Sequence, residues 1–441
     1  MGASNIVGMS HPALSANAPK ARPNILYLTF EGILEPLGRS QVLRYVRNLN
    51  EQGFRYTILS LEHHPVIESV DEVNQLEAEL AASSIGWKHL SYQTGSPRAV
   101  IGNVIRAFRS ARSLIRERQI QLIHARSYVA AGVAFGLRVL TGVRYVFDTR
   151  GYWIDERAAE GRLFNKRIIY STGKWVERLL LRHAAGVVTL TSLMANDLRE
   201  TVLRNSGIPT AVIPTCTDYE EFTLARDRDS DSVLPADVLA RLQSKLVVGM
   251  VGSVNASYCI DESLTLFKNL LLLRPDAHLL CISQQTEVIS RRVKSHGILE
   301  ESFTIVKAQH RDMPEWLRHM DWAFLMLHER FAKRGSMPTK LGELLASGVR
   351  PIQYGCNREV REIVEQSGSG IVLDGITPED LDLAARKIAA NPLTTAEVVT
   401  AREISRRWFD INSGVVEYQR LLSEICQTIQ QNENKSGQRS Y

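Results

Sequence analysis

The order of apolar and helical stretches is the feature that most constrains the fold of this chain. Residues 24–30, 56–61 and 144–148 form short apolar runs with the length and composition of buried strands. Stretches with helical spacing, such as residues 41–52 and 100–118, lie between such runs. Apolar strands that alternate with helices predict a parallel sheet covered by helices on both faces.

The same alternation begins again after a polar stretch at residues 226–234. A chain of 441 residues is too long for one ordinary core and suits two domains of about 200 residues each. The sequence therefore predicts two tandem Rossmann-like, doubly wound α/β domains, with ligands bound in a cleft at the carboxyl ends of the strands. The strands of the second domain are predicted at residues 246–251, 278–282, 303–306, 322–327, 350–353 and 370–373.

The expected domain organisation follows from these segments. The polar, small-residue-rich start lacks a signal-peptide pattern and is expected to be a disordered lead-in. The predicted divisions are the lead-in at 1–23, a first domain at 24–225, a linker at 226–243, a second domain at 244–404, a C-terminal helix crossing back to the first domain at 405–429, and a polar tail at 430–441.

Composition limits the cellular setting. With 44% hydrophobic and 23% charged residues, the chain has no apolar run near the roughly 20 residues that cross a bilayer. The five cysteines are odd in number and lack the paired spacing of a metal site. We expect reduced core thiols and a cytoplasmic protein.

The net charge of +5 conceals an asymmetry. Residues 98–182 carry 17 Lys and Arg against 6 Asp and Glu, a local charge of +11. Within this region Arg106, Arg109, Arg112 and Arg116 lie along one side of a predicted helix, beside an apolar stripe. Such a surface could rest on anionic lipid, or it could be a solvated face over a packed stripe.

The strongest indication of a binding site is the loop and the predicted helix start at residues 335–346. A loop containing Gly335 leads into a helix predicted at residues 338–346, with Ser336 as its expected cap and Pro338 in its first turn. A helix N-terminus offers unpaired N–H groups and the positive end of the helix dipole, which suits a phosphate. Lys340 adds a full positive charge.

Glu343 lies one helical turn further on. A phosphate would repel its carboxylate, but the carboxylate can accept hydrogen bonds from sugar hydroxyls. A phosphate at the helix tip and a ribose one turn further predict a site for a nucleoside diphosphate.

Polar side chains also follow strands in the first half. Gly38 lets the backbone approach a ligand, and Ser40 can cap the helix that follows. Arg150 could hold a phosphate or carboxylate, while Asp148 could orient an acceptor hydroxyl or simply pair with Arg150. His124 ends another strand and could reach the same space, although a lone strand-end histidine is more often a core residue.

Taken in order, these motifs resemble those of the retaining fourth family of GT-B glycosyltransferases, which use nucleotide sugars. Each motif is weak alone, whereas their order and spacing from about residue 24 to residue 422 are specific. The landmarks are residues 36–42, 147–153, 187–191, 213–218, 251–253 and 338–344, with Trp408, Phe409 and Tyr418 in the last helix.

The resemblance implies a donor site in the second domain. Lys340 and Glu343 match the family's nucleotide-sugar motif, and Thr339 lies within it. Gly252 and Ser253 match a loop that approaches the diphosphate. In the first domain, the loop at Gly38 is implied to touch the acceptor and the donor phosphates.

Two positions depart from the family pattern. The family often carries two glutamates with seven residues between them, and the earlier position here is Gly335. The missing acid usually contacts the transferred sugar. A basic pair that often follows the glycine loop is also missing, and Lys333, Arg334 and Lys340 are the candidates to replace it.

The predicted activity is transfer of a sugar, with retention, from a nucleotide-diphosphate sugar to an acceptor hydroxyl in cell-envelope or exopolysaccharide assembly. Lys340, Arg150 and Asp148 are the expected catalytic residues. The resemblance implies a same-face attack in which the leaving phosphate takes the acceptor proton. No metal or other cofactor is expected.

The predicted partners are the nucleotide-sugar donor, a glycan or lipid-linked acceptor and an anionic membrane surface. Nucleic acid is not expected, because no known reading module is present. The alternatives are a catalytically silent nucleotide-sugar-binding partner of another transferase, and a GT-B epimerase or hydrolase. The base, the sugar, the acceptor and the linkage position stay open.

Overall fold

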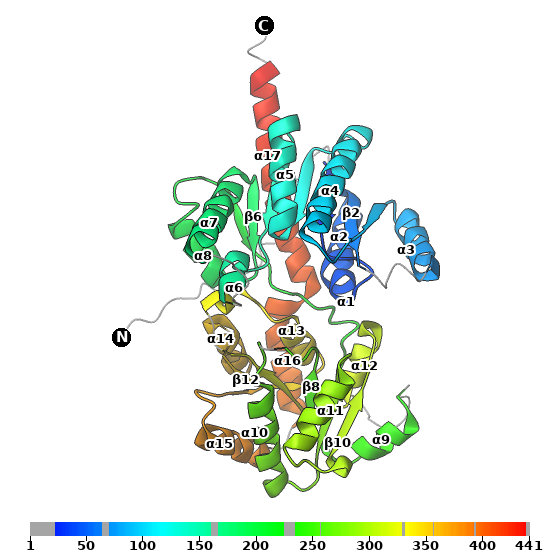
Figure 1. Cartoon of the computed structure of the whole chain (residues 1–441), viewed down its shortest axis with the longest axis vertical. Helices are drawn as coiled ribbons and strands as arrows, with labels where there is room; N and C mark the ends of the chain where they lie inside the picture. Colours follow the sequence, from blue (N-terminus) through cyan, green and yellow to red (C-terminus); the bar gives the residue numbers. More distant parts are fainter. Residues whose placement is uncertain are drawn as a thin grey trace.

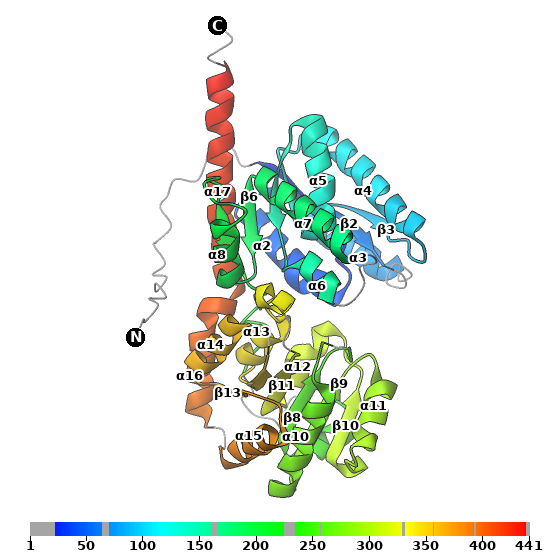
Figure 2. The same cartoon turned by 60° about the vertical axis from the view of Figure 1, so that its left-hand side comes forward.

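The computed structural model describes residues 23–63, 70–159, 166–224, 234–255, 257–328, 331–355, 357–391 and 394–437. Most of the predicted lead-in and of the polar stretch at 226–234 lies outside the described residues. Two α/β domains are stacked along the long axis of the molecule, and the last helices run along both of them (Figures 1 and 2).

The first domain is built on a parallel sheet of seven strands in the order β3-β2-β1-β4-β5-β6-β7. The strands are β1 (Asn24–Thr29), β2 (Arg55–Glu62), β3 (Gly86–Ser91), β4 (Leu122–Arg126), β5 (Arg144–Asp148), β6 (Gly186–Thr189) and β7 (Thr210–Val212). In this register Arg126 lies opposite Asp148, so the ends of β4 and β5 coincide.

Helices connect these strands and cover the sheet. They are α1 (Pro36–Gly38), the π-helical turn η1 (Arg39–Leu43), α2 (Arg44–Glu51), α3 (Val70–Ala82), α4 (Pro97–Glu117), α5 (Ser127–Thr141), α6 (Trp153–Ala159), α7 (Lys166–His183) and α8 (Ser192–Glu200).

The second domain is built on a parallel sheet of six strands in the order β10-β9-β8-β11-β12-β13. The strands are β8 (Leu246–Val251), β9 (Ala277–Ile282), β10 (Phe303–Val306), β11 (Trp322–Met326), β12 (Arg350–Tyr354) and β13 (Ile371–Val372). Its helices are α9 (Ala236–Leu242), α10 (Ile260–Leu273), α11 (Thr286–Ser295), α12 (Met313–Arg318), α13 (Thr339–Ala346), α14 (Arg358–Ser367) and α15 (Pro378–Ala390), with short 3₁₀ turns η3 (Glu300–Ser302), η4 (His310–Asp312) and η5 (Phe331–Gly335).

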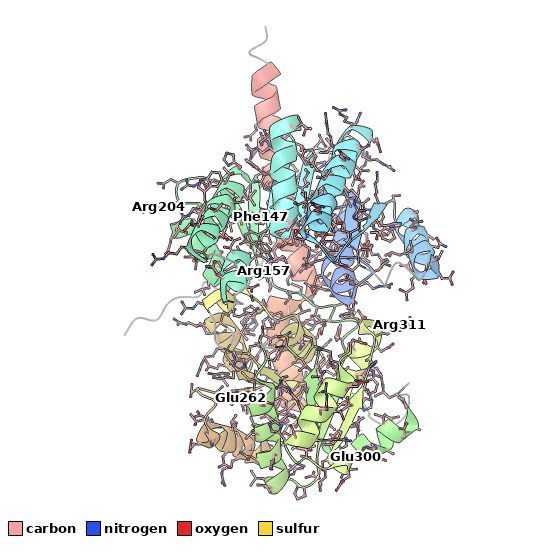
Figure 3. The ribbon with its side chains drawn as sticks, in the orientation of Figure 1. Phe147, Arg157, Arg204, Glu262, Glu300 and Arg311 are labelled. Atoms are coloured by element: carbon pink, nitrogen blue, oxygen red, sulfur yellow. The ribbon has the colours of Figure 1, made fainter. Side chains whose placement is uncertain are left out.

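Each sheet is buried on both faces, as predicted. Along β1, Ile25 and Tyr27 belong to one apolar cluster, whereas Leu26 and Leu28 belong to another. This two-residue alternation places successive side chains on opposite faces of the sheet. Phe147 of β5, labelled in Figure 3, is fully buried in the cluster that includes α5.

The last two helices join the domains. Helix α16 (Thr395–Phe409) packs on α13 and α14, and α17 (Ile411–Gly437) packs on α2 and β7. Where they meet, the Thr217 amide donates to the Phe409 carbonyl (2.7 Å), and the Ile411 amide donates to the Thr217 carbonyl (3.0 Å). The junction of α16 and α17 is thus hydrogen-bonded to the chain segment that follows β7.

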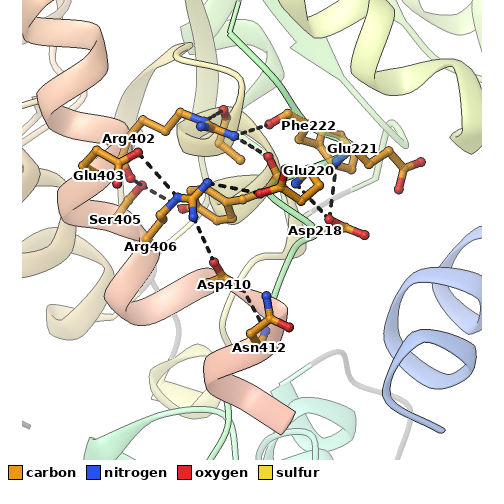
Figure 4. A network of polar contacts seen from close by, with 12 residues as sticks. Asp218, Glu220, Glu221, Phe222, Arg402, Glu403, Ser405, Arg406, Asp410 and Asn412 are labelled. Carbon is orange, nitrogen blue, oxygen red and sulfur yellow. Dashed lines mark hydrogen bonds and ion pairs between the residues drawn. The ribbon is translucent and has the colours of Figure 1, made fainter. Parts of the chain in front are cut away.

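Arginines of α16 reinforce this crossing (Figure 4). Arg402 donates to the carbonyl oxygens of Phe222 (3.0 Å) and Ala346 (2.7 Å), so it joins the connecting segment to α13. Arg406 lies 3.7 Å from the carboxylate of Asp410.

Within the described residues, no helix combines the length and apolar character that a membrane span requires.

Candidate active site

The predicted phosphate site is assembled around Lys340. Its Nζ donates to the Val251 carbonyl oxygen and to the Tyr258 hydroxyl (3.3 Å), and lies 4.3 Å from the centre of the Tyr258 ring. Gly252 has a φ of +108°, and a Cβ there would lie 2.5 Å from Lys340 Nζ. A side chain at position 252 would therefore displace the ammonium group. The structure brings Lys340 and the glycine loop together, as the sequence predicts.

The remaining donor residues surround this contact. Thr339 is the first residue of α13 and is half-buried, while Ser253 is exposed and its Oγ accepts from Asn255 (2.9 Å). Tyr258, Phe324 and Met326 line a recess beside Gly252 and Ser253. The recess lies at the carboxyl ends of β8 and β11, where doubly wound folds bind ligands.

Glu343 is buried and already has a partner. Its Oε1 lies 3.2 Å from Nε2 of His310, which belongs to the turn η4 after β10. Burial lowers the pKa of Arg44 of α2, and the negative charge of Glu343 partly opposes this shift. Glu343 therefore lies where residues of both domains converge.

The start of α13 differs from the sequence prediction. Pro338 is the capping residue, with an extended ψ of 123°, so it precedes the helix instead of lying in its first turn. Ser336 does not cap the helix. Its Oγ donates to Glu156 of α6 in the first domain (3.0 Å), and Lys333 donates to the same carboxylate (3.3 Å). The expected capping residue thus serves as a contact between domains.

A second contact between the domains joins Glu359 of α14 to the N-terminus of α8. The Glu359 carboxylate accepts hydrogen bonds from the amides of Ser192 (2.8 Å) and Leu193 (3.4 Å), in the first turn of α8. Burial raises the pKa of Glu359. A carboxylate at a helix N-terminus is favoured by the helix dipole. This contact holds α14, and the Glu156 contacts hold the segment before α13, against the first domain.

Gly335, which stands where the family has an acid, is buried against the first domain. A Cβ there would lie 2.7 and 2.8 Å from ring carbons of Tyr152, and 3.1 Å from the Met194 sulfur. No side chain fits at position 335 in this arrangement. Arg334, also predicted to bind substrate, is exposed, and its carbonyl oxygen accepts a hydrogen bond from Thr191 (3.5 Å).

The first-domain candidates form a buried ionic cluster at the ends of β4 and β5. Asp148 is fully buried and lies 3.6 Å from the guanidinium of Arg126 and 3.8 Å from that of Arg150. Burial raises the pKa of Asp148, although both arginines oppose the shift. Arg126 also pairs with Glu31 at 2.7 Å, and its charge lowers the pKa of that carboxyl.

Arg150 combines backbone strain with limited exposure. Its φ is +58°, a left-handed conformation that is uncommon for residues other than glycine. Its side chain is only 11% exposed. Such strain persists only where the surrounding structure enforces it, and strained residues cluster at ligand sites.

His124 lies under the same cluster. It is 1% exposed, its ring centre is 4.4 Å from that of Tyr27, and neither ring nitrogen has a hydrogen-bond partner. Burial lowers its pKa to about 3, and the charges of Arg126 and Arg150 act in the same direction. The ring is therefore neutral at physiological pH.

The loop after β1 also differs from expectation. The helix begins at Pro36, so Ser40 lies inside the helical segment and donates to the Pro36 carbonyl (3.0 Å) instead of capping. Gly38 is buried, and a Cβ there would overlap the Gly32 carbonyl oxygen and lie 2.6 Å from Ile33 Cα. The glycine is needed for this close packing, whereas its predicted ligand contact stays a prediction.

Sequence reasoning missed several of these neighbours. Tyr258 contacts Lys340, His310 contacts Glu343, and Glu156 contacts Ser336, each across a long separation in the sequence. His310 had one usable signal, because it follows a predicted strand. Asp148 ends its strand, whereas His124, expected at a strand end, lies in the middle of β4.

Comparison with known proteins agrees with this architecture. Residues 38–216 match the model of the glycosyl transferase 4-like domain. No curated protein matches the chain.

Solved structures cover nearly the whole chain. A sucrose-phosphate synthase from Thermosynechococcus elongatus aligns with a TM-score of 0.68 and 14% identity, over 92% of this chain and all (100%) of the other. HepE of Anabaena, in complex with UDP and glucose, aligns with a TM-score of 0.61 and 15% identity, over 93% of this chain and 100% of the other.

The same fold also carries other activities. A protein from Listeria monocytogenes described as a putative UDP-N-acetylglucosamine 2-epimerase aligns with a TM-score of 0.57 and 12% identity, over 89% of this chain and 94% of the other. At such identities the alignments establish the fold alone. Residues 38–216 thus match the glycosyl transferase 4-like domain, and the chain as a whole shares the two-domain fold of the solved structures with which it aligns.

Proposed function

We propose that the protein moves a sugar from a nucleotide-diphosphate sugar to an acceptor hydroxyl, with retention of configuration. The observation that carries this proposal is the contact of Lys340 with the Gly252 loop at the start of α13, one turn before Glu343. HepE, which shares the fold, was solved with UDP and glucose. A nucleoside diphosphate has the charge for Lys340 and the ribose hydroxyls for Glu343.

In this proposal Lys340 acts on the leaving group. The diphosphate gains negative charge as the glycosidic bond breaks, and a fixed ammonium group stabilises that charge. Gly252 and Ser253 bring backbone to the phosphates. His310 keeps Glu343 in place until the ribose hydroxyls bind.

The first domain would supply the acceptor side. Arg150 is the group we expect to touch substrate, because its side chain is partly exposed whereas that of Asp148 is not. Asp148 has no exposed surface and would act by positioning Arg150 and Arg126. Asp148 is buried and Glu343 is paired with His310, so neither carboxylate acts as a covalent nucleophile in this proposal. Same-face attack with proton transfer to the leaving phosphate is therefore the proposed route, without a metal.

We further propose a lipid-linked or polyanionic acceptor of cell-envelope or exopolysaccharide assembly, used at the cytoplasmic face of a membrane. Arg109 and Arg116 of α4 are exposed, whereas Arg106 is tied to the Ser91 carbonyl (2.8 Å) and Arg112 is half-buried. Ile101 and Ile105 of the same helix are 59% and 45% exposed. Exposed apolar and basic side chains on one helix suit an anionic lipid surface.

Two assays test the function. Calorimetry with UDP, GDP and ADP should identify one base that binds, and transfer from the matching nucleotide sugar should then be followed with acceptor extracts. A product with inverted configuration would refute retention.

Co-sedimentation with anionic vesicles should weaken when Arg109 and Arg116 are replaced by glutamine. Equal, poor pelleting of the wild type and the variant would remove the membrane proposal.

One observation favours a second candidate, a catalytically silent partner that binds nucleotide sugars. Tyr152 fills the space that the missing acid at Gly335 would need. Tight nucleotide binding without turnover, for every sugar and acceptor offered, would support this alternative. Sugar interconversion or hydrolysis without any acceptor would instead support an epimerase or hydrolase.

A further inference from the structure

Three metal-binding side chains meet on the second domain, apart from the predicted donor residues. Cys259 lies directly before α10, Glu262 lies in its first turn (Figure 3), and His328 follows β11. The thiol sulfur, a carboxylate oxygen and an imidazole nitrogen all lie within 4.8 Å of one another. Cys259 is buried, while Glu262 and His328 are half-buried, so solvent reaches the group from one side. We propose that these residues form a binding site for Zn²⁺.

The spacing of the ligand atoms fits a tetrahedral ion. Zn–S and Zn–N bonds of about 2.3 and 2.0–2.1 Å at a tetrahedral angle place sulfur and nitrogen about 3.6 Å apart. Cys259 Sγ and His328 Nδ1 lie 3.4 Å apart. Glu262 needs an adjustment of about 1 Å to complete three protein ligands, which a flexible side chain can make. Water would take the fourth position.

The backbone already fixes the two ligands that lie closest. Tyr258 and Leu327 form an antiparallel bridge. The Cys259 amide donates to the Met326 carbonyl (3.1 Å), and the His328 amide donates to the Ser257 carbonyl (2.9 Å). The segments that carry Cys259 and His328 are thus paired on both sides of the bridge. Little ordering is left for an ion to impose, which favours binding.

The donor set selects the kind of ion. Thiolate and imidazole prefer Zn²⁺ and its spectroscopic substitute Co²⁺, whereas Mg²⁺ and Ca²⁺ prefer oxygen ligands. Binding forms an Sγ–metal bond and releases the Sγ proton to solvent. Without an ion, burial raises the pKa of the Cys259 thiol to about 12 and keeps it protonated.

The bound ion would stiffen the neighbouring loop. Tyr258 immediately precedes Cys259, and its hydroxyl and ring both contact Lys340. An ion held by Cys259 and His328 would therefore fix the segment that supports Lys340. This consequence for the donor site rests on the proposed function, whereas metal binding itself does not.

The test is a titration of the purified full chain, stripped of metal, with Co²⁺ and then Zn²⁺. We expect one equivalent of Co²⁺ to bind with a thiolate-to-metal charge-transfer band in the near ultraviolet, and Zn²⁺ to displace it. Cys259→Ser should abolish the band, and His328→Gln or Glu262→Gln should weaken Co²⁺ binding at least tenfold. Cys281→Ser is the matched control, because Cys281 is also buried but belongs to no such group among the described residues.

The outcomes separate the proposal from its consequence. No stoichiometric band in the wild type, or a band lost equally in Cys281→Ser, would overturn the site. His328→Gln and Glu262→Gln change half-buried side chains, so they test the site even if Cys259→Ser fails to fold. Zinc binding without any effect on nucleotide affinity would keep the site and remove only its link to Lys340.

Discussion

Replacing Gly335 by alanine should strain the contact between the domains. The new Cβ would lie 2.7 and 2.8 Å from carbons of the Tyr152 ring, whereas carbon atoms normally approach to about 3.5 Å. Either the ring or the η5 turn must then move by about 0.8 Å. The ring is 5% exposed, and its hydroxyl donates to Asp197 (2.9 Å), so it cannot simply turn into solvent.

Overpacking of this size typically costs about 1–3 kcal/mol. The assay is equilibrium unfolding in urea of the wild type, Gly335→Ala, Tyr152→Ala and the double variant. If Tyr152 is the obstacle, Gly335→Ala should cost about 1–3 kcal/mol in the wild type and less than about 0.5 kcal/mol beside Tyr152→Ala. An equal cost in both backgrounds would refute the reasoning, because the strain would then arise elsewhere.

Four further outcomes are expected. Glu343→Ala should weaken binding of the matching nucleoside diphosphate by about 1–3 kcal/mol in calorimetry, because ribose hydroxyls lose their acceptor, and unchanged affinity in a folded variant would contradict the assignment. Lys340→Ala should lower turnover more than it raises the donor KM, and an effect on KM alone would indicate ground-state binding only. Activity after EDTA treatment should not depend on added Mg²⁺ or Mn²⁺, and rescue by either ion would contradict a metal-free phosphate site. Burial lowers the pKa of His124 from 6.5 to about 3, so between these pH values the unfolded chain binds a proton that the folded chain does not. The free energy of unfolding should therefore fall as the pH drops below 6.5, by about 2 kcal/mol at pH 5. Urea unfolding at pH 5 and pH 7 should show a smaller fall for His124→Phe than for the wild type, and an identical fall would contradict the shift.

The two-domain architecture could be predicted because periodicity and apolar runs are local properties. Most strands of the sheets, including β1, β8 and β11, are short apolar runs buried on both sides. Strand β3 gave no such signal, because its residues are mostly half-buried at the edge of the sheet. Local pattern thus finds central strands and misses an edge strand.

The site was predictable where chemistry and sequence neighbourhood coincide. Lys340 and Gly252 meet as expected, because Gly252 directly follows β8 and Lys340 lies in the first turn of α13, the helix after the neighbouring strand β11. The role of Ser336 was wrong, because its hydroxyl finds a partner 180 residues away, on the other domain. The pairing of Glu343 with His310 likewise depends on the fold, and no spacing rule would have indicated it.

The adjacent crossings at Thr217 and Asp410 restrict how the two domains can move. The connecting segment and the α16–α17 junction run in parallel and exchange hydrogen bonds through Thr217. Two coincident pivots allow rotation about one region but resist sliding of one domain along the other. Separation should therefore be smallest at Thr217 and grow with distance from it, so the domains could open only if the Glu156 and Glu359 contacts broke. A disulfide or cross-link between those surfaces would hold the enzyme shut without touching either substrate site.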